Sequence, residues 1–266
     1  MKTNNEEIFL ALDLDGTLIK DNNEFTDKTK YYLEKVINSG IEVCIVTGRY
    51  FQSVKDFAIK NDLRIPIVSA NGALIKDPFT LEVFYKATIP LPSVKKIISY
   101  SNDLELLLHI FSDKEWYVNK INKTVNKYAE ENNVKPKLIE NIENNVKKNV
   151  IKMVIVDDKE KINKLVEFIN ENKIEVNTFK SDPYSIDLIS PIASKGEGIK
   201  RLIEKKGKKY KKIIAAGNYF NDIDMFDIAD YSVGMENSPD KVKERADKIV
   251  GSNNNEGIVE LLKELI

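Results

Sequence analysis

Two aspartates one residue apart, Asp13 and Asp15, follow an uninterrupted apolar run that begins at Ile8. Such a run predicts a strand buried on both faces, as in a parallel sheet. Ligands of open α/β sheets bind outside the carboxyl ends of the strands, so both carboxylates are expected where chemistry takes place. Two carboxylates this close repel each other, and a cation between them removes the repulsion.

This pair is suited to nucleophilic and acid–base catalysis. Asp13 is a candidate nucleophile and hard oxygen ligand, while Asp15 is free to pass a proton to and from a leaving group. Mg²⁺ prefers one or two carboxylates together with water and a substrate phosphate. A turn or helix-cap pair is the alternative interpretation of a short D-x-D match. The apolar strand before the pair and Gly16-Thr17 after it favour the functional one.

The bulk composition points away from several classes of protein. Lys and Arg number 41 and Asp and Glu 42 among 266 residues, so the formal net charge of −1 provides no basic field for nucleic acid or anionic lipid. No run approaches the roughly 18 apolar residues that span a bilayer, and the N-terminus lacks the apolar core of a signal peptide. We therefore expect a cytoplasmic protein with a small-molecule substrate and no nucleic-acid or membrane partner; the oligomeric state is not readable.

Two other kinds of nucleophilic site are disfavoured by the scarcity of Cys and His. The one cysteine, Cys44, lies in an apolar strand-like run, and position 50, six residues downstream, is Tyr rather than the Arg of a cysteine-based phosphatase. The one histidine, His109, lies in another strand-like run and would have to serve any Ser-His-Asp triad. A carboxylate-and-metal mechanism is the better hypothesis.

Strands and helices alternate at both ends of the chain, which predicts right-handed βαβ units and a parallel sheet. After the first strand, strands are expected at 41–46, 65–69, 212–216, 231–235 and 248–250, with helices that include 195–206, 221–229 and 238–246. Residues 1–84 and 190–266 are therefore expected to form one core domain.

A different pattern separates these two parts. Closely spaced strands predict antiparallel pairing, so residues 85–189 are expected to form an inserted α+β domain with an open-faced sheet. Strands are expected at 83–89, 104–111, 115–119, 150–156, 174–180 and 185–189, and helices at 92–101, 121–132 and 159–171. The Asn- and Lys-rich stretch 119–149 is interpreted as solvated helix and loop.

Two segments offer groups that could hold a phosphate. The Thr47 hydroxyl and the Gly48 N–H follow a strand and could donate to a phosphate oxygen, although a helix N-cap has the same sequence. Ser194 and Glu197 fit a capping box, which places Lys195 in the first turn of a helix. A cation there opposes the helix dipole at a cost of about 0.3–1 kcal/mol unless an anion lies nearby. An exposed, tolerated lysine is the alternative.

These segments together resemble the haloacid dehalogenase-like (HAD) phosphohydrolases, which form an aspartyl-phosphate intermediate. The D-x-D-G-T pattern at Asp13 resembles the first motif of the family, Thr47-Gly48 the second and Lys195 the third. The segment Gly217–Asp222 resembles the fourth motif, G-D-x-x-N-D, with Asn218 in place of the acidic magnesium ligand. An amide oxygen can still bind a hard cation but brings no charge.

The insert resembles the C2B cap of Cof-type HAD phosphatases, and Asn71-Gly72-Ala73 and the segment 233–237 also look like that subfamily. The resemblance implies an α/β fold with a Rossmannoid parallel-sheet core and an inserted C2B-type cap. It implies a Mg²⁺-dependent phosphoric monoester hydrolase that acts on a sugar phosphate or another small phosphorylated metabolite.

The resemblance also implies roles for individual residues. Asp13 is the nucleophile and a metal ligand, and Asp15 gives a backbone carbonyl to the metal and serves as acid and base. Asn218 completes the metal site, and Asp222 could compensate for its missing charge directly or through water. The groups that would hold the phosphate are those of Leu14 (by its N–H), Thr47, Gly48, Lys195 and Asn221.

Two other functions are compatible with these residues. A phosphomutase of the same cap type would return the phosphoryl group to a sugar rather than to water. A binding or regulatory protein would keep the site but, with Asn218, turn over poorly. Which phosphorylated substrate is used depends on side chains of the insert that the sequence does not place.

Overall fold

The computed structural model describes residues 7–140, 142, 146 and 149–266. Residues 1–6, on which the expected lack of a signal peptide depends, lie outside this part. The chain forms two compact units: one contains residues up to Gly48 together with Phe57–Tyr85 and Ser194–Ile266, and the other contains Arg49–Asp56 and Lys86–Ala193. Helix α2 (Phe51–Lys60) contains one of these boundaries. The segment 49–56 thus belongs to the same unit as the insert. The expected domain limits included it in the core.

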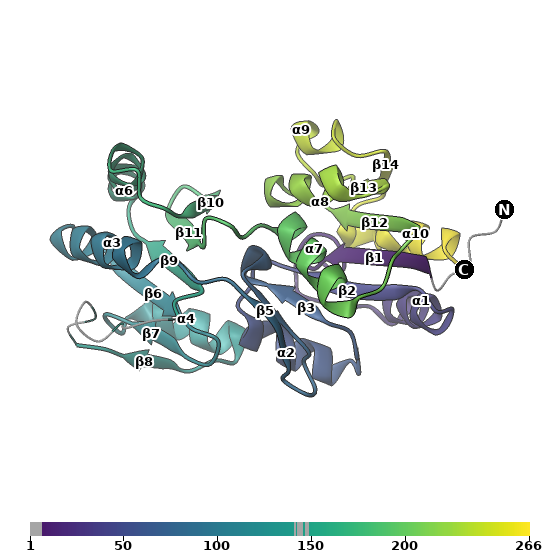
Figure 1. The fold of residues 1–266 in the computed structure, drawn as a ribbon, viewed down its shortest axis with the longest axis horizontal. Helices are drawn as coiled ribbons and strands as arrows, with labels where there is room; N and C mark the ends of the chain where they lie inside the picture. Colours follow the sequence, from purple (N-terminus) through teal and green to yellow (C-terminus); the bar gives the residue numbers. More distant parts are fainter. Residues whose placement is uncertain (1–6, 141, 143–145, 147–148) are drawn as a thin grey trace. The chain divides into compact units, whose positions relative to one another are not determined.

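The first unit is built on an eight-stranded sheet of order β14-β13-β12-β1-β2-β3-β4-β5 (Figure 1). Its strands are β14 (Lys248–Val250), β13 (Tyr231–Met235), β12 (Lys212–Gly217), β1 (Ile8–Asp13), β2 (Glu42–Val46), β3 (Ile67–Ser69), β4 (Leu74–Lys76) and β5 (Val83–Lys86). The pairs from β14 to β3 are parallel, as expected. Strand β4 was not expected; it pairs antiparallel with β3 after a short 3-10 turn, η2 (Ala70–Gly72).

Burial explains why β1 lies in the middle of this sheet. All six of its residues are buried, as the continuous apolar run predicted. The helices of this unit are α1 (Asp27–Asn38), α7 (Lys195–Lys206), α8 (Ile223–Ile228), α9 (Asp240–Lys243) and α10 (Ile258–Glu264). Apolar side chains of α7, α8 and α9 pack against Phe9 and Ala11 of β1 in one core cluster. Helix α9 is a single turn that begins after its N-cap Pro239, shorter than the expected 238–246.

The second unit has a six-stranded sheet of order β10-β11-β9-β6-β7-β8. Its strands are β6 (Leu107–Phe111), β7 (Trp116–Val118), β8 (Pro136–Leu138), β9 (Lys152–Val156), β10 (Asn177–Asp182) and β11 (Ser185–Ile189). Its helices α3 (Leu91–Asp103) and α6 (Lys159–Glu171) pack on one face of the sheet, and α4 (Lys123–Asn132) packs with a smaller aromatic cluster. The pairs are antiparallel, as expected, apart from β7 with β8.

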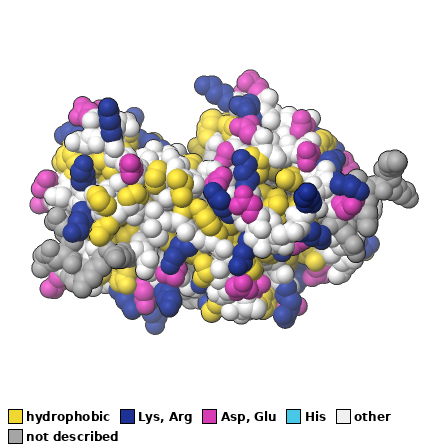
Figure 2. Space-filling view, viewed as in Figure 1, with side chains coloured by type: hydrophobic (Ala, Val, Ile, Leu, Met, Phe, Trp, Pro, Cys, Tyr) yellow, Lys and Arg dark blue, Asp and Glu magenta, His cyan; other side chains and the backbone are white. Residues whose placement is uncertain are grey.

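Strand β8 corrects the interpretation of 119–149 as helix and loop only. It is a three-residue edge strand with exposed side chains that begins at Pro136, so it carries no alternating apolar pattern. Residues 141, 143–145 and 147–148 of that stretch lie outside the described part. No helix among the residues described is both long and apolar enough to cross a bilayer. On the face shown in Figure 2, basic and acidic side chains are interspersed, in keeping with the net charge of −1.

Candidate active site

The parallel register of β1 with its two neighbours brings the expected site residues to one edge of the sheet. Asp13 lies opposite Val46 of β2, and Leu12 lies opposite Ala216 of β12. Thr47 and Asn218 come shortly after these partners, so both follow strands that flank Asp13. Segments about 35 and 200 residues away along the chain therefore meet at the end of β1 for a purely geometric reason.

Lys195 connects this edge of the sheet to helix α7. Its Nζ lies 2.6 Å from Oδ1 of Asp13 and 2.5 Å from Oδ1 of Asp222. Ser194 is the N-cap of α7 and its side chain accepts the Glu197 N–H, as the capping box predicted. Only 2 % of Lys195 is exposed, which excludes the alternative of a solvent-exposed lysine. The anion that the helix dipole argument required is the pair of carboxylates.

Burial and charge act in opposite directions on these ionisable groups. Burial and the negative charge of Asp222 raise the pKa of Asp13 to about 7, against the lowering effect of Lys195. Burial alone would lower the pKa of Lys195, but the charges of Asp13 and Asp222 outweigh it, and the pKa of Lys195 is raised. Lys195 is therefore a fixed cation at neutral pH, held against a carboxylate that is sensitive to the charges around it.

The other oxygen of Asp13 faces a cluster of oxygen atoms that could act as metal ligands. The outer amide atom of Asn218 on this side lies 3.2 Å from Asp13 Oδ2, 2.8 Å from the Asp15 carbonyl oxygen and 3.3 Å from Thr17 Oγ1. Octahedral Mg²⁺ with ligands at about 2.1 Å requires neighbouring ligand atoms to be about 3.0 Å apart. With the Asn218 oxygen turned toward the cluster, its distances to Asp13 Oδ2 and to the Asp15 carbonyl oxygen, 3.2 and 2.8 Å, are close to this spacing.

This donor set has only one side-chain carboxylate. Consistent with that, no three His, Cys, Asp or Glu side chains are grouped to hold a metal ion within the described residues. The side chain of Asp15 is exposed while its backbone faces the cluster, which suits exchange of a proton with solvent or substrate.

Asp222 has a different position from the one expected. Its Oδ1 accepts from Lys195, and its Oδ2 accepts the backbone N–H groups of Asn218 and Tyr219 at 2.8 and 2.9 Å. Asp222 is fully buried. Both oxygens thus accept hydrogen bonds, and Asp222 holds Lys195 and the Asn218 loop together. Its expected role toward the metal, directly or through water, stays a prediction. This loop forms the 3-10 turn η3 (Phe220–Asp222) before α8, where a single helix over 221–229 was expected.

Asn71, noted in the sequence only as part of a familiar motif, connects two of the expected phosphate-binding residues. Its Oδ1 accepts from Nδ2 of Asn221 at 2.9 Å, and its backbone N–H donates to the Thr47 carbonyl at 3.0 Å. The same Oδ1 would lie 3.1 Å from a Cβ placed on Gly48. Asn71 has φ 49°, a left-handed conformation that Asn tolerates better than most residues. The groups of Thr47, Gly48 and Asn221 that are expected to bind phosphate therefore all lie around the Asn71 side chain.

Two further residues hold the start of α7 in place. A Cβ on Gly72, which has φ +90°, would lie 1.9 Å from the Ser194 carbonyl oxygen, so only glycine allows this close approach. Asp224 Oδ2 accepts the Gly196 N–H at 2.8 Å. Both residues position Lys195 through its helix, and their only sequence signal was proximity to a motif.

Leu14, expected to offer its N–H to a phosphate, is fully buried between the two aspartates. Its carbonyl accepts from the N–H groups of Leu18 and Ile19, each at 3.0 Å. These bonds turn the chain directly after β1. The role of its N–H stays a prediction.

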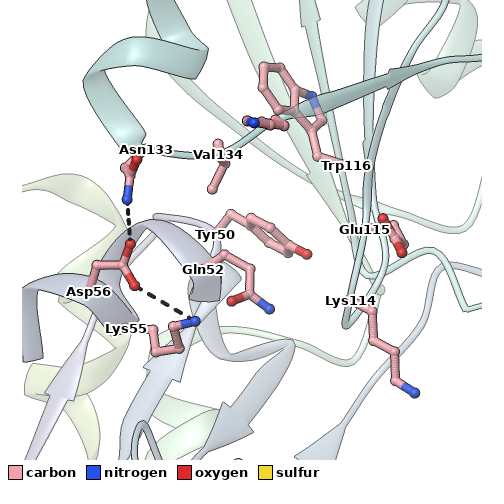
Figure 3. Close-up of a pocket in the computed structure, with 10 residues that line it drawn as sticks. Tyr50, Gln52, Lys55, Asp56, Lys114, Glu115, Trp116, Asn133 and Val134 are labelled. Carbon is pink, nitrogen blue, oxygen red and sulfur yellow. Dashed lines mark hydrogen bonds and ion pairs between the residues drawn. The ribbon is translucent and has the colours of Figure 1, made fainter. Parts of the chain in front are cut away.

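A cavity of about 180 Å³ lies in the second unit and is lined in part by Tyr50, Asp56 and Trp116 (Figure 3). Asp56 accepts from Asn133 at 2.8 Å and pairs with Lys55 at 3.7 Å. Asp56 is thus already bound to neighbouring side chains. None of the expected site residues lines the cavity. The candidate active site is therefore the cluster at the end of β1.

Comparison with known proteins agrees with this fold and identifies the family. The family model of the haloacid dehalogenase-like hydrolases matches residues 10–262. The chain is 27 % identical to the 5-amino-6-(5-phospho-D-ribitylamino)uracil phosphatase YitU of Bacillus subtilis, with 96 % of each chain covered. A crystal structure from Thermotoga maritima superposes with a TM-score of 0.86 at 30 % identity over 96 % of each chain. A sugar phosphatase of HAD subclass IIB superposes with a TM-score of 0.83 at 23 % identity, covering 97 % of this chain and 99 % of that one.

Proposed function

The chain belongs to the haloacid dehalogenase-like hydrolases and is a phosphatase of that superfamily, and from this premise we propose that it hydrolyses small phosphomonoesters through a phosphorylated Asp13, with Mg²⁺. The observation that carries the proposal is the environment of Asp13. One of its oxygens is 2.6 Å from the buried Lys195 ammonium, and the other faces the oxygen cluster of Asp15 and Asn218. A carboxylate held between a fixed cation and a metal position is suited to approach a phosphate dianion.

The chain's own residues provide the steps of a two-stage displacement. Asp13 attacks phosphorus, so that a bond from its carboxylate oxygen to phosphorus forms as the ester oxygen–phosphorus bond breaks. Asp15 gives its proton to the departing oxygen. Asp15 then takes a proton from a water molecule, which attacks the same phosphorus and releases the Asp13 carboxylate and inorganic phosphate.

Electrostatic stabilisation supplies much of the catalysis of such a reaction. A magnesium ion bound by Asp13 Oδ2, the Asp15 carbonyl and Asn218 would neutralise charge on the phosphate and keep Asp13 ionised. Lys195 holds its positive charge beside Asp13 without reorganisation, because Asp222 fixes its other side. We assign phosphate contacts to the Leu14 N–H, Thr47, Gly48, Lys195 and Asn221.

The substrate class we propose is a sugar phosphate or another small phosphorylated metabolite. Support comes from relatives: YitU is a phosphatase for a ribitylaminouracil phosphate, and the subclass IIB neighbour is a sugar phosphatase. The near-neutral net charge also favours a small substrate over a polyanion.

Release of inorganic phosphate from a panel of phosphomonoesters, with Mg²⁺ or with EDTA, tests the proposal. We expect Asp13→Asn, which keeps the size of the side chain, to lower kcat by at least about a thousandfold, because the nucleophile is lost. Asp62→Asn, at a site whose side chain is 70 % exposed, is the matched control and should keep wild-type activity. Retention of more than a tenth of the activity in Asp13→Asn would exclude Asp13 as the nucleophile.

The neutral Asn218 supports a second candidate function, a phosphate-ligand-binding or regulatory protein with poor turnover. Asn218→Asp restores the missing charge beside Asp13 and distinguishes the two. A gain in turnover supports the hydrolase, whereas binding of phosphate without turnover by either form supports the binding protein. Isomer formation in place of phosphate release would identify a phosphomutase.

A further inference from the structure

The side-chain amide of Asn218 faces a cluster of oxygens at distances that allow two orientations, with either its oxygen or its nitrogen toward the cluster. The atom on this side lies 2.8 Å from the Asp15 carbonyl and 3.2 Å from Asp13 Oδ2, and neither of these groups can donate a proton when Asp13 is ionised. An amide oxygen here fits a cluster with a cation at its centre. An amide nitrogen here lies within donating distance of three oxygens, including Thr17 Oγ1 at 3.3 Å, and its two hydrogens can serve the Asp15 carbonyl and Asp13.

The two ends of a carboxamide have nearly the same shape, so hydrogen bonding decides which end faces the cluster. Without a cation, an oxygen at this position would repel two acceptors across less than 3.3 Å. The nitrogen instead satisfies them. An aspartate at position 218 has no donor and would add a charge to the same cluster, so only the amide can serve the site both with and without a metal.

Neighbouring atoms restrict how the Asn218 side chain can rotate. A Cβ on Gly16 would lie 2.3 Å from the other end of the Asn218 amide, so glycine at position 16 leaves just enough room for it. The Gly16 carbonyl accepts from Nδ2 of Asn237 at 2.9 Å, and the Asn218 N–H donates to Asp222. The side chain is thus held at both its backbone and its outer edge. Rotation about the last side-chain torsion, which is nearly twofold, is the movement that this enclosure permits.

We propose that Asn218 is a two-position group that turns by half a turn when a divalent cation binds. In the metal-free protein its NH₂ group donates to Asp15 and Asp13 and takes the place of the cation; in the metal-bound protein its oxygen becomes a ligand. This inference rests on the metal site of the proposed function. It explains why Asn218 is neutral: the amide stabilises the metal-free site, and the site binds Mg²⁺ less tightly as a result.

The stability of the metal-free protein tests this directly. In EDTA, we expect Asn218→Asp to lower the thermal unfolding midpoint by about 3–8 °C, because the cluster loses donors and gains a charge. Asn218→Ala loses the hydrogen-bond donors without adding a charge, so its unfolding midpoint should lie between those of Asn218→Asp and the wild type. Asn126→Asp, on the exposed side of α4, introduces the same charge elsewhere and should change the midpoint little. Equal midpoints for Asn218→Asp and Asn126→Asp in EDTA would overturn the proposal.

Titration with Mg²⁺ adds a second, independent measurement. The wild type should show a smaller rise in unfolding midpoint than Asn218→Asp, whose Mg²⁺ affinity we expect to be at least tenfold higher. By NMR, the Asn218 NH₂ pair, assigned from its absence in Asn218→Asp, should exchange slowly with solvent in EDTA and lose that protection with Mg²⁺. If Mg²⁺ shifts the backbone resonances of Asp13 and Asp15 but leaves the NH₂ pair unchanged, the amide does not turn and the proposed function is unaffected. If Mg²⁺ shifts none of them, the metal site of the proposed function fails as well.

Discussion

Lys195 is the residue on which the electrostatics of the site depend. It is 2 % exposed and contacts two carboxylates that would otherwise repel each other inside the protein. Removing one member of a buried ionic cluster leaves the remaining charges without compensation, which costs far more than the net contribution of the pair. Lys195 is therefore expected to matter for stability as well as for activity.

Replacement of Lys195 by Met keeps the length of the side chain and removes its charge. We expect Lys195→Met to lower the free energy of unfolding by about 3–5 kcal/mol, measured by urea denaturation, and to abolish phosphate release. Lys200→Met, on the exposed face of the same helix, is the control and should change stability by less than about 0.5 kcal/mol. If the two variants are equally stable, Lys195 does not compensate Asp13 and Asp222 in the way described. Adding Asp222→Asn to Lys195→Met should recover part of the loss.

The position of Lys195 is decided by contacts of whole elements. Helix α7 begins against the η2 turn, and the contact is so close that the Gly72 Cα and the Ser194 carbonyl leave no space for a methyl group. The α7 N-terminus is also held by Asp224 through the Gly196 N–H. A displacement of this helix start would move the ammonium group away from Asp13.

Gly72 and Gly207 form a matched pair that tests this contact. Both have positive φ, but a Cβ on Gly207, the C-cap of α7, would meet no atom of the described residues within 4 Å. Gly72→Ala should lower the free energy of unfolding by at least about 2 kcal/mol and reduce kcat, since it adds a steric clash to backbone strain. Gly207→Ala should cost about 1 kcal/mol from strain alone and keep wild-type kcat. Equal losses in urea denaturation and equal kcat values would show that the η2–α7 contact is not critical.

At the scale of the whole molecule, each unit has its own hydrophobic core, and His109 lies in that of the second. It is 2 % exposed, its Nε2 has no hydrogen-bond partner among the residues that the structure describes, and its ring stacks on Trp116 with 5.5 Å between the ring centroids. Burial, helped by the charge of Lys152, lowers the pKa of His109 to about 4, below the ordinary histidine value of about 6.5. It is the chain's one histidine, so its titration can be followed without interference. This buried location gives no support to a Ser-His-Asp triad, which the sequence already disfavoured.

The lowered pKa of His109 predicts the sign of a pH effect on stability. Between pH 6.5 and 4 the unfolded chain binds a proton at His109 that the folded chain does not, so stability falls as the pH falls, by at most about 1.4 kcal/mol per pH unit. The stability difference between the wild type and His109→Phe should follow this slope, because contributions of other groups, Asp13 included, cancel. Urea denaturation of both proteins from pH 4 to 8 measures it. A pH-independent difference, or an NMR-determined pKa of 6.5 or above, would contradict the prediction.

Some of this protein was readable from local patterns, because each of them depends on residues close together along the chain. The apolar run before Asp13 predicted the buried central strand, alternation of strands and helices predicted the parallel core, and the Ser194 cap predicted the first residue of α7. By contrast, β8 was missed because an exposed three-residue edge strand has no periodicity to detect.

The remaining features were decided by tertiary structure, since they depend on contacts between segments far apart in the chain. The sequence predicted that Asp13, Asp15 and Lys195 serve one chemistry, through their types, their places at the ends of elements and their resemblance to the HAD motifs. It did not reveal that Asp222 has both oxygens occupied, that Asn71 joins Asn221 across 150 residues, or that the Asn218 amide is enclosed by Gly16. Hydrogen bonding of a side chain is set by whatever the fold places around it, and only the assembled sheet and helices determine that.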